Sequence, residues 1–362
     1  MKRLPLASLL ALLLALALAA CGGDSTPESG TPTDEPTSEP TDAAATDTAS
    51  PDATTAEGGL RIAVLPKAIN NPYFDASFTG AQTACEELGA TCEYVGPTDA
   101  TGAAQVEFIN TVVQQGFSAL VVSAADQEAI IPALQQAQTR GLTVVTFDAD
   151  VTDPAARSVF IQPSSTELIG QQQIAWAAEQ IGSEGEIAIL SAAATAENQN
   201  AWIEVMEAEL EKPEYSGMEL VEIAYGDDDA AKSAEKAAGL LQAHPELKAI
   251  IAPTTVGIRE AAKYISGSEY KGEVVVTGLG LPSEMRTYVE DGTVAKFGLW
   301  NPVDLGYIAV HAAAQIAGGE LTAEPGATFT AGDFSLEVGE DNIVVVGPPF
   351  EFNAENIGEF EF

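Results

Sequence analysis

The chain has 362 residues, 46% of them hydrophobic, and a formal net charge of −39 at pH 7. Its length is enough for about two domains of common size, each with its own core. The strong negative charge argues against binding to nucleic acid or to anionic membrane surfaces, because both would repel it.

Residues 1–20 are predicted to be a signal peptide. Lys2 and Arg3 precede an apolar run that is too short to span a bilayer comfortably and that ends in small residues. The sequence LAAC, which ends at Cys21, resembles the bacterial lipobox, in which the cysteine becomes the lipid-modified first residue of the mature protein. We therefore expect an exported lipoprotein that is held at the extracytoplasmic face of the cell membrane only by acyl chains on Cys21.

Residues 21–59 are predicted to be a disordered acidic spacer that follows the lipidated cysteine. The segment is rich in Ser, Thr, Pro, Asp and Glu, contains no Lys or Arg, and has hardly any large apolar side chain. Such a segment cannot bury enough apolar surface to offset the entropy lost on ordering.

From Leu60 onward, short apolar runs alternate with longer segments of helical period. LRIAVLP, TCEYVGP, ALVVSA and TVVTFDAD are strand-like, and the same rhythm restarts after Ser164 with EIAILSA, MELVEIAYG, AIIAP and VVVTGLG. This alternation predicts an α/β protein with two doubly wound, Rossmann-like parallel-sheet domains. We expect a three-crossing hinge near Pro163, Trp300 and Ala327. The N-terminal lobe would comprise residues 60–163 and 301–327, and the C-terminal lobe residues 164–300 and 328–362.

Enzymatic chemistry is not predicted. His244 and His311 are the only histidines, and neither lies in a motif for nucleophilic catalysis or has metal-ligand spacing. The acidic DADVTD segment lacks the glycine and the distal glutamate of a calcium loop, and GLGL lacks the third glycine of a dinucleotide loop. No metal and no cofactor are therefore expected.

Once Cys21 is assigned to the lipid, Cys85 and Cys92 remain. In an exported protein an even remainder is consistent with a disulfide, here between a helix end and the next strand. Two unpaired thiols are the alternative. A zinc site is excluded for this pair because no histidine lies nearby in the sequence.

Polar and aromatic side chains follow the carboxyl ends of several predicted strands, where ligands bind in open α/β sheets. Their hydroxyl, amide and carboxylate groups suit the hydroxyls of a pyranose, and the aromatic rings suit its C–H faces. The residues expected from this pattern to bind a sugar are Lys67, Asn71, Phe74, Asp148, Asp150, Asn198, Gln199, Asn200, Trp202, Thr254, Thr255 and Trp300.

These residues carry a resemblance to a known family. NNPYFDAS resembles the first-loop element of the type I periplasmic binding proteins, which include ribose, galactose and arabinose receptors of ABC importers. LSAAATAENQNAWIEVM, AIIAPTTVGI, VTGLGLPSEM, LWNPVDLGY and GATFTAG are similar to the rhamnose-binding receptors. The resemblance extends from about Arg61 to Phe362. It implies a monomeric receptor that binds a monosaccharide in the interlobe cleft and delivers it to a permease and an ATPase.

The resemblance also implies roles for individual residues. It adds Tyr73, as an aromatic of the first loop, and Asn301, beside Trp300 at the second crossing. Ribose-type receptors carry an aspartate where GLGL places Gly280, so the hydroxyl pattern recognised here must differ from that of ribose.

Receptors of the signal autoinducer-2 (AI-2) share the lysine at Lys67 and the aspartate at Asp148. They carry an acidic residue in place of Asn198 and an alanine in place of Thr255, so L-rhamnose is the favoured ligand and AI-2 the alternative. Sugar-responsive repressors of the same fold begin with a basic DNA-binding segment, which this chain lacks. A sugar sensor without a transport role stays open.

Overall fold

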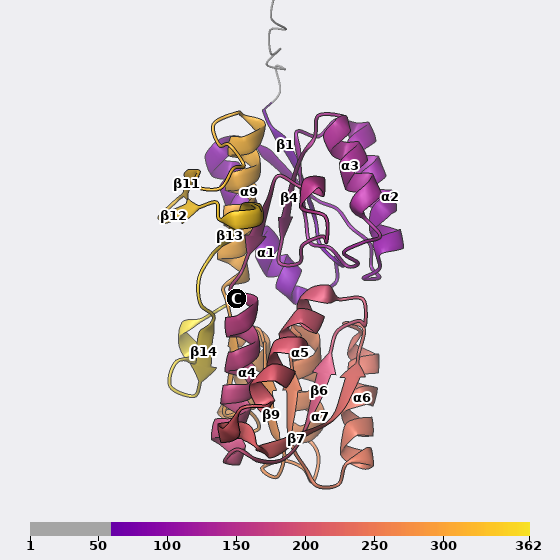
Figure 1. Ribbon diagram of the computed structural model, residues 1–362, viewed down its shortest axis with the longest axis vertical. Coiled ribbons are helices and arrows are strands. Elements are labelled where there is room, and N and C mark those ends of the chain that lie inside the picture. Colours follow the sequence, from indigo (N-terminus) through magenta and orange to yellow (C-terminus); the bar gives the residue numbers. More distant parts are fainter. Residues whose placement is uncertain (1–58) are drawn as a thin grey trace, which may run out of the picture. The chain divides into compact units, whose positions relative to one another are not determined.

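The computed structural model describes residues 59–362, so the predicted signal peptide, Cys21 and nearly all of the predicted spacer lie outside the described residues. Two groups of strands organise this part of the chain. One is a six-stranded sheet, and the other is a four-stranded sheet extended by a two-stranded ladder. Figure 1 shows the first sheet in the upper half and the second in the lower half. The predicted class, two α/β lobes with parallel sheets, is confirmed.

The first lobe contains the elements β1 (Arg61–Leu65), α1 (Pro72–Leu88), β2 (Thr91–Tyr94), α2 (Gly102–Gln115), β3 (Ala119–Val122), α3 (Ile131–Thr139), β4 (Thr143–Phe147), β5 (Val159–Gln162), α9 (Pro302–Ala317), β11 (Thr328–Ala331), β12 (Phe334–Glu337) and β13 (Ile343–Val345). The second lobe contains α4 (Thr166–Ile181), β6 (Glu184–Ser191), α5 (Glu197–Leu210), β7 (Gly217–Tyr225), α6 (Ala230–Ala243), β8 (Leu247–Ala252), α7 (Thr255–Ser266), β9 (Val275–Gly278), α8 (Pro282–Glu290), β10 (Lys296–Leu299) and β14 (Phe350–Asn353).

The sheet of the first lobe has the strand order β13-β5-β4-β3-β1-β2 and is parallel throughout. Its central strands are buried on both faces. Along β1, Ile62 and Val64 join the core under α1 and α9, whereas Ala63 and Leu65 join the core under α2 and α3. This two-sided burial explains why the strands are continuous apolar runs.

Helices α1 and α9 pack closely because each presents a glycine to the other. A Cβ atom on Gly80 would lie 1.8 Å from the carbonyl oxygen of Val303, and one on Gly306 would lie 1.9 Å from that of Ser77. Any side chain at either position would force the helices apart. The contact joins the first helix of the lobe to a helix that returns to it more than 200 residues later.

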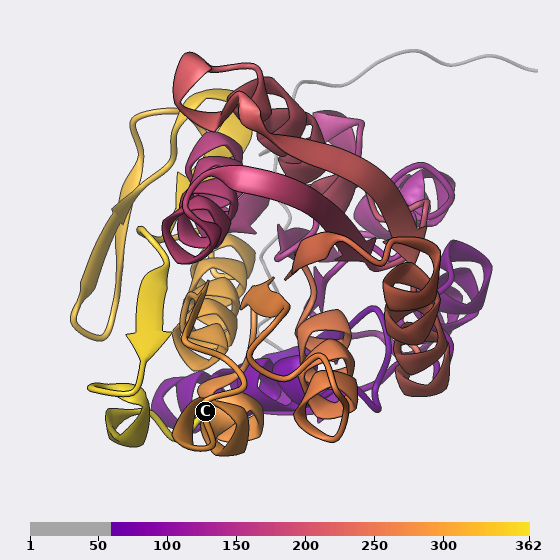
Figure 2. The same ribbon diagram turned by 90° about the horizontal axis from the view of Figure 1, so that it is seen from below.

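The second sheet has the parallel order β7-β6-β8-β9, with α4 and α5 on one face and α6 and α7 on the other. A bridge between Leu279 and Gly298 brings β10 alongside the end of β9, and β10 pairs with β14 in antiparallel orientation. Figure 2 shows helices on either side of these strands and the yellow C-terminal segment along one edge.

The chain passes between the lobes three times. These passages lie at 163–165, at 300–301 and at 346–349, whereas the third crossing was predicted near Ala327. The prediction placed 328–362 in the C-terminal lobe, whereas the β11–β12 hairpin packs on α9 and β13 pairs with β5. The error arose because β13 has only three residues, and its pattern does not indicate a partner strand about 180 positions earlier.

Cys85 at the end of α1 and Cys92 in β2 are joined by a disulfide with 5.9 Å between their Cα atoms. Within residues 59–362, no helix is long and apolar enough to cross a membrane.

Candidate functional site

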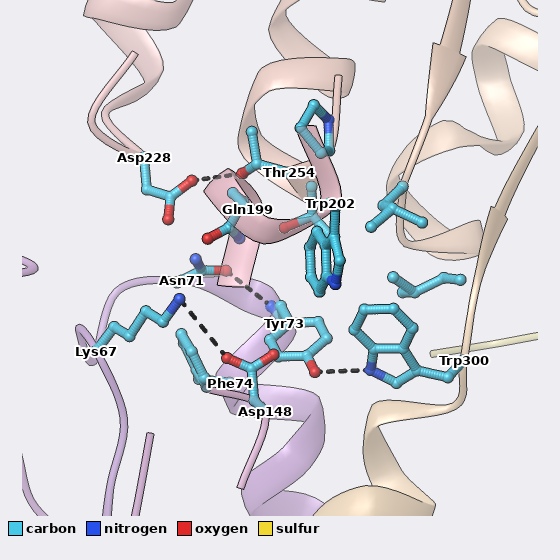
Figure 3. Close-up of a pocket in the computed structure, with 14 residues that line it drawn as sticks. Lys67, Asn71, Tyr73, Phe74, Asp148, Gln199, Trp202, Asp228, Thr254 and Trp300 are labelled. Atoms are coloured by element: carbon cyan, nitrogen blue, oxygen red, sulfur yellow. Dashed lines mark hydrogen bonds and ion pairs between the residues drawn. The ribbon is translucent and has the colours of Figure 1, made fainter. Parts of the chain in front are cut away.

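A pocket lies between the lobes at the carboxyl ends of both sheets, with about 360 Å³ of space that protein atoms do not fill, part of it open to solvent. We call it the inner pocket; its lining consists of Lys67, Asn71, Tyr73, Phe74, Asp148, Gln199, Trp202, Asp228, Pro253, Thr254, Thr255, Leu279, Leu299 and Trp300. Figure 3 shows the labelled side chains of the two lobes pointing toward one another.

The first lip of the inner pocket is the start of α1. The Asn71 side chain caps this helix by accepting a hydrogen bond of 3.0 Å from the backbone nitrogen of Tyr73, and Pro72 occupies the first helical turn. Both are favoured at these positions because the first N–H groups of a helix lack intrahelical partners. The cap uses the Asn71 amide oxygen, so the amide nitrogen is the group that can donate to a ligand.

Aromatic side chains form a connected wall that spans the cleft. The Trp300 indole nitrogen donates to the Tyr73 hydroxyl at 2.7 Å, and the rings of Trp202 and Trp300 lie 5.9 Å apart between centroids (Figure 3). Burial and the neighbouring Asp148 raise the pKa of the Tyr73 phenol well above its ordinary value. Tyr73 therefore keeps its proton and can act as a donor as well as an acceptor.

Asp148 directly follows β4 and has a left-handed backbone with φ of 62°. Its side chain accepts a hydrogen bond of 2.8 Å from the Ser123 hydroxyl and lies 3.9 Å from the Lys67 ammonium group. Both charged side chains are at least 93% buried. Lys67 also donates to the Asn198 amide oxygen at 3.0 Å and thereby links the two lobes.

Asp228 is a second pocket carboxylate, which the sequence analysis missed. It follows β7, has a left-handed backbone with φ of 52°, and accepts a hydrogen bond from the Thr254 hydroxyl (Figure 3). Loss of hydration raises the pKa of its carboxyl group, an effect that the Lys67 charge opposes. The sequence GDDDA, at the end of a predicted strand, could have identified Asp228. The other polar residues of the pocket were predicted from the same kind of position, the carboxyl end of a strand.

Most of the residues that the sequence predicted to bind the ligand lie together in this pocket. The predicted residues that line it are Lys67, Asn71, Tyr73, Phe74, Asp148, Gln199, Trp202, Thr254, Thr255 and Trp300. The prediction also missed three apolar lining residues, Pro253, Leu279 and Leu299.

Four predicted residues lie outside the inner pocket. Asp150 forms an ion pair of 2.7 Å with Arg157. Asn200 donates to the carbonyl oxygen of Ala194, and Asn301 caps α9. The fourth, Asn198, accepts a hydrogen bond from Lys67. Each is close to a strand end, but its hydrogen bonds within the protein hold it outside the inner pocket, a difference that strand-end position alone does not reveal.

Gly280 was treated as a position that faces the ligand, and the structure corrects this. A Cβ atom there would lie 2.8 Å from the Met285 side chain and 3.1 to 3.2 Å from Ile258 and Phe297, so this position faces the core. Its neighbour Leu279 faces the pocket instead. At the end of β9 the inner pocket therefore has an apolar side chain.

The inner pocket thus combines two carboxyl groups, one ammonium group, amides and hydroxyls with aromatic and leucine surfaces. This mixture suits a neutral ligand that bears hydroxyl groups on an apolar frame. Within residues 59–362, no group of three or more His, Cys, Asp or Glu side chains could hold a metal ion.

Comparisons with known proteins agree with this fold and site. A family model described as periplasmic binding protein domain matches residues 62–321. A sugar ABC transporter structure from Actinomyces odontolyticus is 47% identical, with a TM-score of 0.69, and the alignment covers 84% of this chain and 98% of that one.

Two further solved structures contain ligands. A solute-binding protein from Clostridium phytofermentas with bound L-rhamnose is 34% identical, with a TM-score of 0.81 and coverage of 84% of this chain and 98% of that one. LsrB from Clostridium saccharobutylicum in complex with AI-2 is 25% identical, with a TM-score of 0.78 and coverage of 84% and 100%.

Proposed function

We propose that this chain, which belongs to the periplasmic binding protein domain family, captures L-rhamnose in its inner pocket for delivery to an ABC importer. Its similarity to sugar receptors makes it a type I sugar-binding protein of the ABC transporter class, and such proteins are not enzymes. The identity of the sugar is the part that we propose.

The observation that carries the proposal is the division of the inner pocket into polar and apolar parts. Asp148 and Asp228 can accept hydrogen bonds from ring hydroxyls, and Leu279 and Leu299 add aliphatic surface to the aromatic wall. A 6-deoxy sugar needs this combination, because its hydroxyls require partners while its methyl group requires an apolar contact. The 34% identity to a protein with bound L-rhamnose supports the same ligand.

AI-2 is the second candidate, and Lys67 is the observation that favours it. This lysine is buried in the pocket beside Asp148, the pair that the sequence shares with AI-2 receptors. Thr255 lines the pocket where those receptors carry an alanine. Threonine has a hydroxyl group that alanine lacks, so it offers one more possible partner for a hydroxyl of rhamnose.

A panel of sugars tests the ligand directly. We expect L-rhamnose to raise the thermal unfolding temperature, with smaller shifts for sugars that add a 6-hydroxyl and little shift for ribose. A ligand at a hundred times its dissociation constant stabilises the folded state by about 2.7 kcal/mol. A shift with AI-2 alone would establish the second candidate, and no shift with any of these compounds would refute both.

The proposal includes a lipid anchor at Cys21, which lies outside the described residues. Mass spectrometry of the membrane fraction should find acyl chains on Cys21, and the Cys21→Ser variant should appear in the soluble fraction. An unmodified Cys21 in membrane-bound protein would refute the anchor without affecting the sugar assignment.

A further inference from the structure

A second cavity adjoins the inner pocket and shares Asp148 and Trp202 with it. It has about 710 Å³ of space between protein atoms, part of it open to solvent. We call it the outer cavity; its lining consists of Gln127, Asp148, Asp150, Phe160, Gln162, Pro163, Ser164, Thr166, Glu197, Asn198, Ala201, Trp202 and Ile343. These residues come from both lobes and from the first crossing, so the outer cavity is part of the same cleft.

Two residues that line the outer cavity carry buried polar atoms that have no partner among residues 59–362. The Ser164 hydroxyl and the Asn198 amide nitrogen each lack a hydrogen-bond partner, and Ser164 is only 1% exposed. The Asn198 oxygen is already occupied by Lys67, so its amide nitrogen is the group left to bind another molecule. Buried polar groups of this kind normally have a partner, because leaving one unpaired costs about 1 to 3 kcal/mol.

The remaining wall of the outer cavity is mixed in character. Phe160, Ile343 and Trp202 supply apolar surface, and Glu197 and Gln162 supply acceptors and donors. A sugar ring suits this wall as it suits the inner pocket, because its hydroxyls can bind the polar side chains and its C–H faces can pack on the apolar ones.

The cavity on the other side of the inner pocket differs in this respect. It also adjoins Lys67 and Asp228, but two of its aspartates have partners within the protein: Asp227 is paired with Lys232, and Asp229 caps α6. None of the buried polar side-chain atoms that lack a partner within residues 59–362 belongs to that cavity. Among residues 59–362, the unpaired buried polar atoms of the cleft thus belong to the inner pocket, which has Gln199 Oε1, and to the outer cavity, which has Ser164 and Asn198.

We propose that the outer cavity is a second saccharide subsite, so that the protein binds a glycoside whose first sugar occupies the inner pocket and whose second sugar occupies the outer cavity. The proposal rests on the proposed function, since the first ring must bind in the inner pocket. The second ring would accept from Asn198, exchange hydrogen bonds with Ser164, and pack near the shared Trp202.

Titration calorimetry with three ligands tests the subsite. The ligands are L-rhamnose and two neutral disaccharides, one with rhamnose at its non-reducing end and one with rhamnose at its reducing end. We expect at least one disaccharide to bind as tightly as rhamnose or more tightly. If rhamnose binds and both disaccharides bind more than twofold more weakly, the subsite is overturned and the proposed function stands. If rhamnose does not bind, the proposed function itself is overturned, together with the subsite that depends on it.

Variants locate the second ring. Ala201→Leu places extra volume in the outer cavity, and Ser164→Ala removes an unpaired hydroxyl; neither residue lines the inner pocket. We expect Ala201→Leu to weaken disaccharide binding at least tenfold and Ser164→Ala at least threefold, with rhamnose binding within twofold of wild type. Ala193→Leu is the matched control on the opposite cavity. Weakened disaccharide binding in Ala193→Leu alone would overturn the assignment to the outer cavity.

Discussion

Asp148 and Asp228 bring the two carboxyl groups of the inner pocket into position in the same way. Each follows a strand, and each has a positive φ, 62° and 52° respectively. Aspartate tolerates this left-handed conformation better than most residues because its short polar side chain can form local hydrogen bonds. In this protein the carboxyl groups are held by residues that are distant in sequence, Ser123 for Asp148 and Thr254 for Asp228, which each donate a hydroxyl hydrogen bond. A sharp turn at the strand end thus directs each carboxyl group into the cleft.

Replacement of Asp148 by alanine should weaken sugar binding about tenfold or more. Hydrogen bonds to a charged group contribute roughly 1.5 to 3 kcal/mol each, and about 1.4 kcal/mol corresponds to a factor of ten. Titration calorimetry with L-rhamnose measures the effect. Asp153→Asn is the control, because Asp153 belongs to the same loop but lies outside the inner pocket. An Asp148→Ala dissociation constant within twofold of wild type would remove this residue from the site.

Replacement of Asp228 by asparagine should change the pH dependence of stability. The folded-state pKa of Asp228 is raised above its ordinary value of 3.8. The stability that this group contributes is therefore fully present below its unfolded-state pKa and is lost as the pH rises through the folded-state pKa. Asparagine does not titrate but can still accept from Thr254.

The free energy of unfolding of Asp228→Asn should therefore increase relative to wild type as the pH rises from below the ordinary pKa of Asp228 toward neutrality. Urea unfolding of both proteins at several pH values measures this difference. A difference that stays constant over the same range would show that the carboxyl group is not desolvated in the folded protein.

At the scale of elements, the segment between β4 and β5 is tied to the C-terminal part of the first lobe by one side chain. Arg157 is 3% exposed, its Nε and Nη2 bind the Asp150 carboxylate, and its Nη1 donates to the carbonyl oxygen of Asp341 at 2.9 Å. Asp341 directly precedes Asn342 and strand β13. The ion pair therefore links the segment that presents Asp148 to the strand that leads into the third crossing.

Replacing one partner of this ion pair should lower the free energy of unfolding more than replacing both partners. Arg157→Met leaves a partly buried carboxylate without its partner, which costs roughly 3 to 5 kcal/mol when a buried pair is broken. The double variant Arg157→Met/Asp150→Leu should recover most of that loss, because no buried charge then remains unpaired. Urea unfolding of wild type, both single variants and the double variant measures the coupling. Additive losses in the double variant would show that the two residues act independently.

At the scale of the whole molecule, two hydrogen bonds cross the cleft, and closure of the lobes has to form them. Lys67 of the first lobe binds Asn198 of the second at 3.0 Å, and Trp300 at the second crossing binds Tyr73 of the first lobe at 2.7 Å. A ligand in the inner pocket would touch residues of both lobes. Its binding energy therefore favours whichever arrangement brings those residues together.

We expect the three crossings at 163–165, 300–301 and 346–349 to act as a hinge that closes on the sugar. Small-angle X-ray scattering should show a smaller radius of gyration at saturating L-rhamnose than without it, because the closed arrangement is more compact. The Asp148→Ala variant at the same sugar concentration should show a smaller decrease, since fewer molecules are occupied. An unchanged radius for wild-type protein with bound sugar would contradict hinge closure.

The sequence by itself determined the fold class and predicted many of the residues that line the inner pocket. Strands that are buried on both faces must be continuous apolar runs, so their alternation with helical segments was visible without coordinates. Parallel strands place their carboxyl ends at one edge of the sheet, so residues such as Lys67, Asp148 and Thr254 could be expected to converge. The resemblance to known receptors added Tyr73, which strand-end position did not single out.

Only the tertiary structure decided which strand-end residues face the inner pocket and where the chain crosses between the lobes. Asp148 and Asp150 are equivalent in sequence terms, but the buried Arg157 holds Asp150 away from the pocket. Leu279 faces the pocket while Gly280 faces the core. The position of β13 depends on pairing with β5, far away along the chain. Each of these outcomes depends on partners that are distant in sequence, and a local pattern of residue types does not identify such partners.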